Sequence, residues 1–176
     1  KIGETDDPSR TMLGSEQMNF LLNRWTSSTA TWNLVGNSVM FTQVLIPPLD
    51  PQTSGAITEL LGLPQDGVPY NSDQWDGYAH ERRKLIGEMS GRNLDNVVFL
   101  TGDIHSSWAC NVPVTPGQYP ADGIAAAEIV CTSVSASNID DIVKLPQRNP
   151  ISQTAEQALM TANPYVEWIE FDHHGW

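Results

Sequence analysis

The feature that most constrains the fold is an apolar run at residues 97–100, followed at once by Thr-Gly-Asp-Ile-His. Such a run ahead of a glycine is typical of a buried strand that ends in a tight turn. The turn carries Asp103 and His105, and we expect their side chains to point the same way because side chains alternate along an extended chain. A carboxylate and an imidazole on one rigid segment suit a metal site, although a turn Asp and a hydrogen-bonded His are an ordinary alternative.

Charge limits the partners of this chain. Its 176 residues suffice for one domain with a buried core, and its formal net charge is −12. Such a surface repels nucleic acid and anionic membranes, so we expect no nucleic acid as a structural partner. With only nine Lys and Arg residues in all, a phosphate site would draw its positive charge from bound metal held by acidic ligands.

Segments that would mark a compartment are missing from the sequence. No run approaches the roughly 18 apolar residues of a transmembrane helix. The chain starts at Lys1 and shows no signal peptide, which we interpret as a mature, processed or truncated piece. Cys110 and Cys131 form either one disulfide or two free thiols, and the sequence alone does not decide between them. Because cross-strand pairs often miss the Cα separation of roughly 4.4–6.8 Å, we expect free thiols.

Apolar periodicity predicts short helices and strands in alternation. The expected helices cover residues 15–26, with Ser15 as the cap, 79–89 and 154–160. The expected strands cover residues 32–35, 96–100, 108–112, 126–132 and 165–171, with an extended or partly helical segment at 39–46. Residues 47–74 are expected to form a long surface excursion. The pattern indicates an α/β or layered αββα fold in which Asp103 and His105 lie outside the carboxyl end of a strand.

Five motifs occur in a characteristic order along nearly the whole chain. They are residues 10–17 (RTMLGSEQ), 72–78 (SDQWDGY) with Glu81 and Arg82, 96–108 (NVVFLTGDIHSSW), 127–133 (AEIVCTS), and the closing Asn163-Pro164 with His174-Gly175-Trp176. Together they resemble the PhoD family of alkaline phosphatases, in the calcineurin-like metallophosphoesterase superfamily. The family pattern ends in Gly-Tyr, and here Trp176 replaces the tyrosine. We assign no ligand role to Asn37, because Ser38 follows it where the superfamily has His.

The resemblance covers the C-terminal half of such an enzyme. It implies that residues 1–176 form the C-terminal part of a single metallophosphatase catalytic domain, within a four-layer αββα sandwich. The family's upstream ligands, a Cys, an Asp-x-x-Tyr segment and an Asn, have no counterpart in this sequence. We therefore expect that these residues alone neither hold a dinuclear centre nor catalyse hydrolysis, and that a second chain or an upstream segment supplies the missing half.

The resemblance also implies a chemistry. Asp103 and His105 match the family's last metal-binding motif, which implies Ca²⁺ near Asp103 and Fe³⁺ near His105. Two metals roughly 3.5–4 Å apart clamp a phosphoryl group and activate a bound water for in-line attack. The implied activity is hydrolysis of phosphate monoesters, with diesters as a second substrate class, in a secreted or periplasmic enzyme.

Other polar residues are weaker candidates. Asp76 is either a helix N-cap or a catalytic residue that lines or supports the phosphate site. Arg10 is a candidate to bind substrate phosphate or to support Asp103, and His174 a candidate pocket residue. Arg82 and Arg83 are expected on a solvated helix face.

Two rival functions stay open. A phospholipase D-type phosphodiesterase shares the fold family, and activity on phosphatidylcholine against nitrophenyl phosphate separates it from a phosphatase. An inactive fragment that serves as a binding or structural module is favoured by the missing upstream ligands. Copurification of a second polypeptide with an Asp-x-x-Tyr segment would argue against that module.

Overall fold

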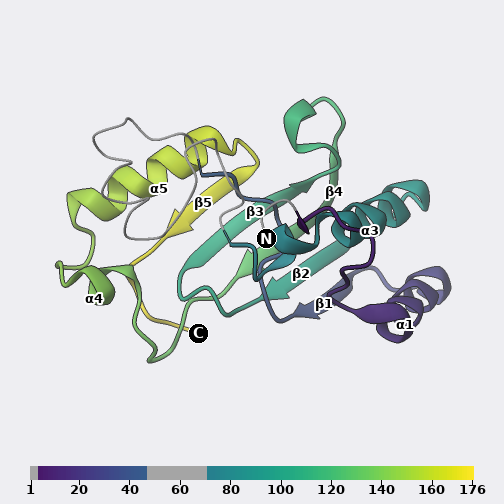
Figure 1. Ribbon diagram of the computed structural model, residues 1–176, viewed down its shortest axis with the longest axis horizontal. Helices are drawn as coiled ribbons and strands as arrows, with labels where there is room; N and C mark the ends of the chain where they lie inside the picture. The colour runs from purple at the N-terminus through teal and green to yellow at the C-terminus, as the bar shows by residue number, and fades with distance from the viewer. Residues whose placement is uncertain (1–3, 47–70) are drawn as a thin grey trace.

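A single five-stranded sheet organises the chain (Figure 1). The computed structural model describes residues 4–46 and 71–176, so most of the expected excursion at 47–74 lies outside the described residues. The strands are β1 (Asn33–Asn37), β2 (Val97–Thr101), β3 (Ser107–Pro113), β4 (Ile124–Val130) and β5 (Val166–Glu170), in the order β1-β2-β4-β3-β5. β1, β2 and β4 are parallel, and β3 runs antiparallel between β4 and β5. This mixed sheet confirms the expected α/β class.

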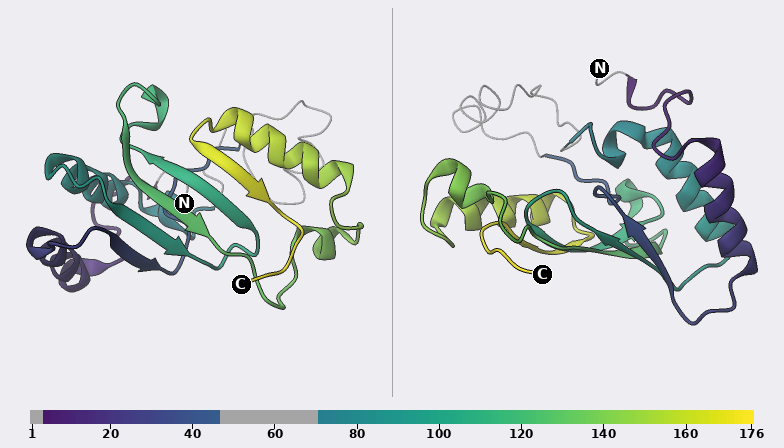
Figure 2. Two further views of the ribbon diagram at one scale, coloured as in Figure 1. Left: turned by 180° about the vertical axis from the view of Figure 1, so that it is seen from behind. Right: turned by 90° about the horizontal axis from the view of Figure 1, so that it is seen from below.

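The main helices lie on one side of the sheet (Figure 2, right). They are α1 (Gly14–Ser27), α3 (Ala79–Gly91), α4 (Ile139–Val143) and α5 (Pro150–Ala162), with short 3₁₀ helices η2 (Trp75–Tyr78) and η3 (Pro116–Gln118). α5 begins earlier than expected because the Asn149 side chain accepts the backbone N–H groups of Ile151 and Ser152, with Pro150 in the first turn. Among the described helices, none has the length and apolar character needed to cross a bilayer.

Two clusters of buried side chains fill the space between the helices and the sheet. The first packs α1 and α3 against β2 and β4 and includes Met18, Trp25, Phe41, Leu85, Met89 and Phe99. The second lies under α5 and includes Met40, Trp108, Leu159, Val166 and Ile169. Met40 belongs to one cluster and Phe41 to the other, so the segment that leaves β1 joins the two halves of the core.

That joining segment differs from the expectation for residues 39–46. In the described residues it forms neither a helix nor a strand, apart from an isolated bridge at Leu45. Its backbone N–H groups are bound by buried side chains instead: those of Phe41 and Thr42 donate to the Glu128 carboxylate, and that of Val44 donates to Asp76. Because these acceptors satisfy the backbone, the segment needs no neighbouring strand.

The start of α1 also differs from the expectation. Ser15 lies inside the helix and does not cap it; the cap position is Leu13, whose side chain has no hydrogen-bonding group. The Glu81 carboxylate on α3 accepts the backbone N–H groups of Met12 at 2.5 Å and Leu13 at 3.2 Å. A carboxylate distant in sequence thus holds the chain directly ahead of the helix, and no local pattern predicts this contact.

The opposite face of the sheet is uncovered by the described residues. Exposed fractions there are 64% for Leu34, 46% for Leu100, 48% for Ile129 and 49% for Trp168. The run at 97–100 is expected to be buried, but β2 is buried on the helix side only, and β1 is at most half-buried. Parallel strands are normally covered on both faces, so this surface is unusually apolar.

Candidate functional site

The carboxyl ends of four strands meet at one edge of the sheet. β1, β2 and β4 run parallel, and β5 runs with them because β3 is antiparallel to both β4 and β5. The segments that leave β2, β4 and β5 here are residues 102–106, 131–138 and 171–175. They carry Asp103, His105 and His174, so the structure brings three of the predicted site residues to the same edge, where α/β sheets bind ligands.

The turn after β2 is not extended, and the alternation argument for Asp103 and His105 is wrong. Both residues have positive φ values, 75° and 54° respectively. Asp and His tolerate this left-handed region better than most residues, but it still costs about 1–3 kcal/mol per residue. The indole N–H of Trp108 donates to the Ser106 hydroxyl at 2.7 Å where the turn enters β3. Such strained turns cluster at active sites, which favours a functional role.

The ring of His105 is held at one nitrogen. Its Nδ1 lies 3.0 Å from the carbonyl oxygen of Ser137. A carbonyl only accepts, so Nδ1 carries a proton, and in the neutral ring Nε2 keeps the lone pair that a metal requires. Metal-binding histidines commonly donate their second ring N–H to a carbonyl in this way. The exposed ring of His105 is therefore prepared as a nitrogen ligand.

Asp103 is oriented by a buried side chain. The amide Nε2 of Gln74 donates to Oδ2 of Asp103 at 3.4 Å. Gln74 is buried immediately ahead of η2, whereas Asp103 is exposed. This contact leaves Oδ1 and the solvent side of Oδ2 open, so the carboxylate can accept a cation.

Asp76 occupies a different environment and is not an N-cap. It lies within η2 with 6% of its surface exposed. One carboxylate oxygen pairs with Arg82 on α3, and the other accepts the backbone N–H of Val44 at 3.2 Å. The expectation that Arg82 lies on a solvated helix face is therefore wrong, whereas Arg83 is exposed as expected. A catalytic role of Asp76 stays a prediction.

Arg10 contacts η2. Its Nε donates to the Gly77 carbonyl at 3.2 Å, and its guanidinium lies 4.8 Å from the centre of the Tyr78 ring. Gly77 is required there because a Cβ atom would lie 1.7 Å from the Ser72 carbonyl oxygen. These contacts join the N-terminal segment to η2, and the substrate role of Arg10 stays a prediction.

His174 joins two of the segments at the edge. Its Nε2 lies 3.3 Å from the Asp141 carboxylate, and its Nδ1 lies 3.2 Å from the Ser133 hydroxyl. The neighbouring His173 pairs with Glu170. Burial would raise the pKa of Glu170, but the hydrogen bonds from the backbone N–H groups of His173 and Asp172 hold it below its ordinary value.

Comparison with known proteins agrees with this geometry. A family model described as PhoD-like phosphatase matches residues 1–176. The chain belongs to the PhoD-like phosphatase family. Alkaline phosphatase D of Bacillus subtilis (strain 168) is 30% identical over 174 residues, which are 98% of this chain and 25% of that protein. A solved chain described as "Structure of PhoD" matches with a TM-score of 0.73 and 31% identity, over 98% of this chain and 28% of that one.

These values confirm the resemblance and the metallophosphoesterase-type fold. The chain spans about a quarter of the length of both PhoD relatives, which is less than the half that the resemblance implied. Residues 4–46 and 71–176 bring no three His, Cys, Asp or Glu side chains together as a metal site. Asp103 and His105 nevertheless supply a carboxylate and an imidazole of fixed tautomer, so they fit part of the metal centre that the PhoD-like family implies.

Sequence reasoning missed the role of Glu128, which binds the end of β2 directly ahead of the turn in this PhoD-like chain. Glu128 is fully buried in β4, and its carboxylate accepts a hydrogen bond from the Thr101 hydroxyl at 2.6 Å. It also accepts hydrogen bonds from the backbone N–H groups of Phe41 and Thr42 at 2.8 and 2.7 Å. Thr101 ends β2 directly ahead of the turn. The available signal was a single carboxylate at an inward position of the apolar run at 124–130.

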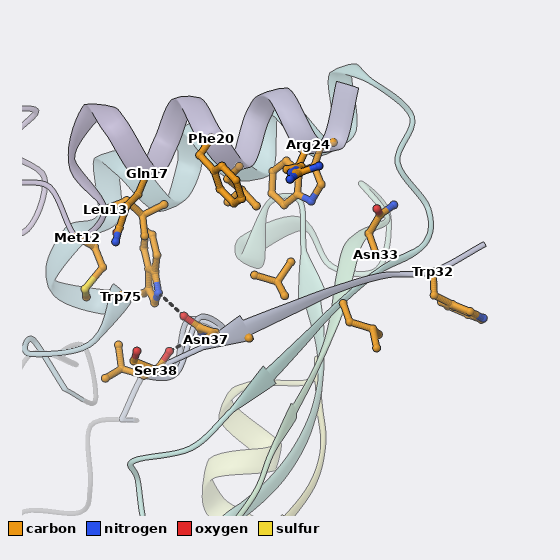
Figure 3. Close-up of a pocket in the computed structure, with 16 residues that line it drawn as sticks. Met12, Leu13, Gln17, Phe20, Arg24, Trp32, Asn33, Asn37, Ser38 and Trp75 are labelled. Atoms are coloured by element: carbon orange, nitrogen blue, oxygen red, sulfur yellow. Dashed lines mark hydrogen bonds between the residues drawn. The ribbon is translucent and has the colours of Figure 1, made fainter. Parts of the chain in front are cut away.

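Asn37 was also missed as a structural contact. It ends β1 and accepts a hydrogen bond from the indole N–H of Trp75 at 3.1 Å (Figure 3). Its amide donates to the Thr101 hydroxyl at 3.1 Å. Phe20 and Trp32 border the pocket drawn in the same view, between α1 and β1. Its volume is about 610 Å³. Neither Asp103 nor His105 lines this pocket.

The two cysteines are free, as expected. Cys110 pairs in register with Glu128, so it lies three positions along the ladder from Cys131 and on the opposite face. Burial raises the pKa of the Cys110 thiol, and the nearby Glu128 charge raises it further.

Proposed function

We propose that this chain forms part of a PhoD-type phosphatase that hydrolyses phosphate esters at the edge formed by the turn after β2. The observation that carries the proposal is the prepared state of His105, whose Nδ1 is 3.0 Å from a carbonyl oxygen. Asp103 lies two residues away with its carboxylate exposed. A nitrogen donor and an oxygen donor on one short turn match the ligand preferences of a mixed metal centre.

The metals that the family resemblance implies are Fe³⁺ and Ca²⁺. When bound, such ions polarise a phosphoryl oxygen and make water a stronger nucleophile. His105 would hold the iron-type metal through Nε2, and Asp103 would hold the calcium through its carboxylate oxygens. Gln74 keeps the Asp103 side chain in place. The chain carries a formal charge of −12, so the metals rather than Lys or Arg supply the positive charge that binds the phosphate ester.

The remaining ligands are proposed to come from the part of the catalytic domain that lies outside this chain, in cis or on a second polypeptide. The uncovered sheet face supports this. Leu100, Ile129, Ala109 and Trp168 are successive cross-strand partners across β2, β4, β3 and β5. We call these four residues the open row. Packing a second apolar sheet on the open row would complete the expected four-layer αββα sandwich.

The test is turnover of the active holoenzyme that contains this chain, with His105→Ala. We expect kcat to fall by about 10³-fold or more, because a metal ligand is lost. His80→Ala is the matched control, because His80 is an exposed histidine on α3. Activity of His105→Ala near that of His80→Ala would overturn the proposal. Parallel assays with nitrophenyl phosphate and phosphatidylcholine distinguish a phosphatase from a phospholipase D-type enzyme.

The open row has its own test. Trp168→Asp should abolish activity by preventing the second sheet from packing. Ile151→Asp is the control, because Ile151 is 67% exposed on α5, on the helical side. Equal activities of the two variants would contradict the role of the open row. A secreted or periplasmic location also stays a proposal from the resemblance, and cell fractionation tests it.

A further inference from the structure

A buried side chain holds the two ends of the loop after β4 together. The hydroxyl of Ser133 donates to Oδ1 of Asn138 at 2.8 Å and also contacts the Ala136 carbonyl. Asn138 is fully buried, and its Nδ2 donates to the Asp172 carbonyl at 3.1 Å. One amide side chain therefore fixes the loop at 133–138 and joins it to the segment that leaves β5.

A second set of contacts fastens the same loop. The backbone N–H of Asn138 donates to the Asp141 carboxylate at 3.1 Å, at the start of α4. The same carboxylate oxygen lies 3.3 Å from Nε2 of His174. The backbone N–H of Gly175 donates to the Ser133 carbonyl at 3.1 Å. The loop is thus held on both sides of Asn138, and its backbone has little freedom to move.

This loop supplies the partner of His105. The carbonyl that accepts from Nδ1 belongs to Ser137, the residue immediately before Asn138. The position of that carbonyl depends on Asn138, because its buried amide joins Ser133, at the start of the loop, to the Asp172 carbonyl in the segment after β5.

We propose that Asn138 is the positioning residue for His105. This inference rests on the proposed function. The buried amide of Asn138 holds the Ser137 carbonyl in place, and the carbonyl keeps the proton of His105 on Nδ1, so that Nε2 is available to the metal. Without that carbonyl the ring is free to rotate and to exchange tautomers, and a ligand with the wrong tautomer offers an N–H in place of a lone pair. Asn138 acts through His105 and need not touch the substrate.

The experiment compares Asn138→Ala with Asn163→Ala in the active protein. Asn163 is the matched control, because it is also a fully buried asparagine with several hydrogen bonds, and it precedes the opposite end of β5. In metal-free protein, ¹⁵N chemical shifts of labelled histidine report the tautomer of His105. In metal-loaded protein, the metal dissociation constant, kcat and KM are measured.

We expect Asn138→Ala to populate the second tautomer of His105, to weaken metal binding by about 10- to 100-fold, and to lower kcat more than KM changes. Asn163→Ala should leave the His105 shifts unchanged. If Asn138→Ala does not fold, Ser133→Ala removes one donor to Asn138 and should shift the same signals by a smaller amount.

Wild-type His105 shifts in folded Asn138→Ala, or in Ser133→Ala if that is the variant measured, would overturn the inference. So would an equal response of Asn163→Ala. Failure of the proposed function is separable, because an active His105→Ala enzyme would remove the catalytic role while the tautomer shift in Asn138→Ala could still be observed.

Discussion

Asp76 and Asp103 are both aspartates beside a glycine in a family motif, but their surroundings differ in the folded molecule. Asp76 is buried, and both of its carboxylate oxygens contact the protein, one through Arg82 and one through the backbone of Val44. Asp103 is exposed in a turn with positive φ, with one long hydrogen bond from Gln74. The first arrangement stabilises the fold, whereas the second leaves a carboxylate available for a ligand at a cost in backbone strain.

The comparison teaches that satisfaction of hydrogen bonds separates the two roles better than residue type does. A buried carboxylate whose two oxygens both contact protein groups is less available to a metal ion. The exposed Asp103 carboxylate, with one hydrogen bond from Gln74 and with His105 two residues away, is more available. Substitution of Asp76 is therefore expected to lower the free energy of unfolding, whereas substitution of Asp103 is expected to lower turnover.

The largest expected change in stability belongs to Asp76→Ala. It leaves the Arg82 guanidinium buried without this partner, which costs about 3–5 kcal/mol in the free energy of unfolding. Urea unfolding followed by circular dichroism measures this. Asp73→Ala is the control, because Asp73 is exposed nearby. A loss below about 1 kcal/mol for Asp76→Ala would show that the ion pair is not structural.

Asp103→Asn should separate activity from stability in the opposite sense. The side chain is exposed, so the free energy of unfolding should change by no more than about 0.5 kcal/mol. Turnover of the active protein should fall by about 100-fold or more, because an amide is a weaker calcium ligand than a carboxylate. Steady-state kinetics and urea unfolding on the same preparation provide both values. If Asp103→Asn is stable and retains full turnover, Asp103 has no role in catalysis and the proposed difference from Asp76 is wrong.

The pH dependence of stability gives a smaller effect at the same edge of the sheet. The pKa of Glu170 is lowered from an ordinary value of 4.5. A lowered folded-state pKa contributes stability that is present above the ordinary value and is lost as the pH falls through the folded-state value. The advantage of the wild type over Glu170→Gln should therefore be full at pH 7 and shrink below about pH 4.5. An advantage that grows with acidity would contradict the assignment.

The smallest effect is expected from the thiols. Cys131 is exposed and Cys110 is buried with a raised pKa. A thiol reagent without reductant should therefore modify one cysteine in the native chain and two after denaturation. Reaction of neither thiol after denaturation would reveal a disulfide and contradict the strand register.

Local patterns in the sequence predicted most of the regular elements, although not α4. The apolar spacing of Met18, Leu21 and Trp25 gave α1, and the run at 97–100 gave β2. The motif order gave the family, which the comparisons confirm. These signals succeed because helical and strand periodicities are set by near neighbours in the chain.

The remaining features depend on contacts between distant residues. Glu81 on α3 accepts the N–H groups of the two residues ahead of α1, and Glu128 on β4 accepts those of residues 41 and 42. The left-handed backbone of Asp103 and the carbonyl of Ser137 beside His105 have no local signature. A buried carboxylate satisfying remote N–H groups is invisible to any periodic pattern, although an isolated charge in an apolar strand hints at it.

The most direct measurement of the central claim is the metal content of the active protein by mass spectrometry of the elements. The wild type, His105→Ala and His80→Ala are purified identically and dialysed against metal-free buffer. The account predicts that His80→Ala retains the wild-type metal content, whereas His105→Ala loses iron-type metal and turnover together. Full metal content and full turnover in His105→Ala would contradict it.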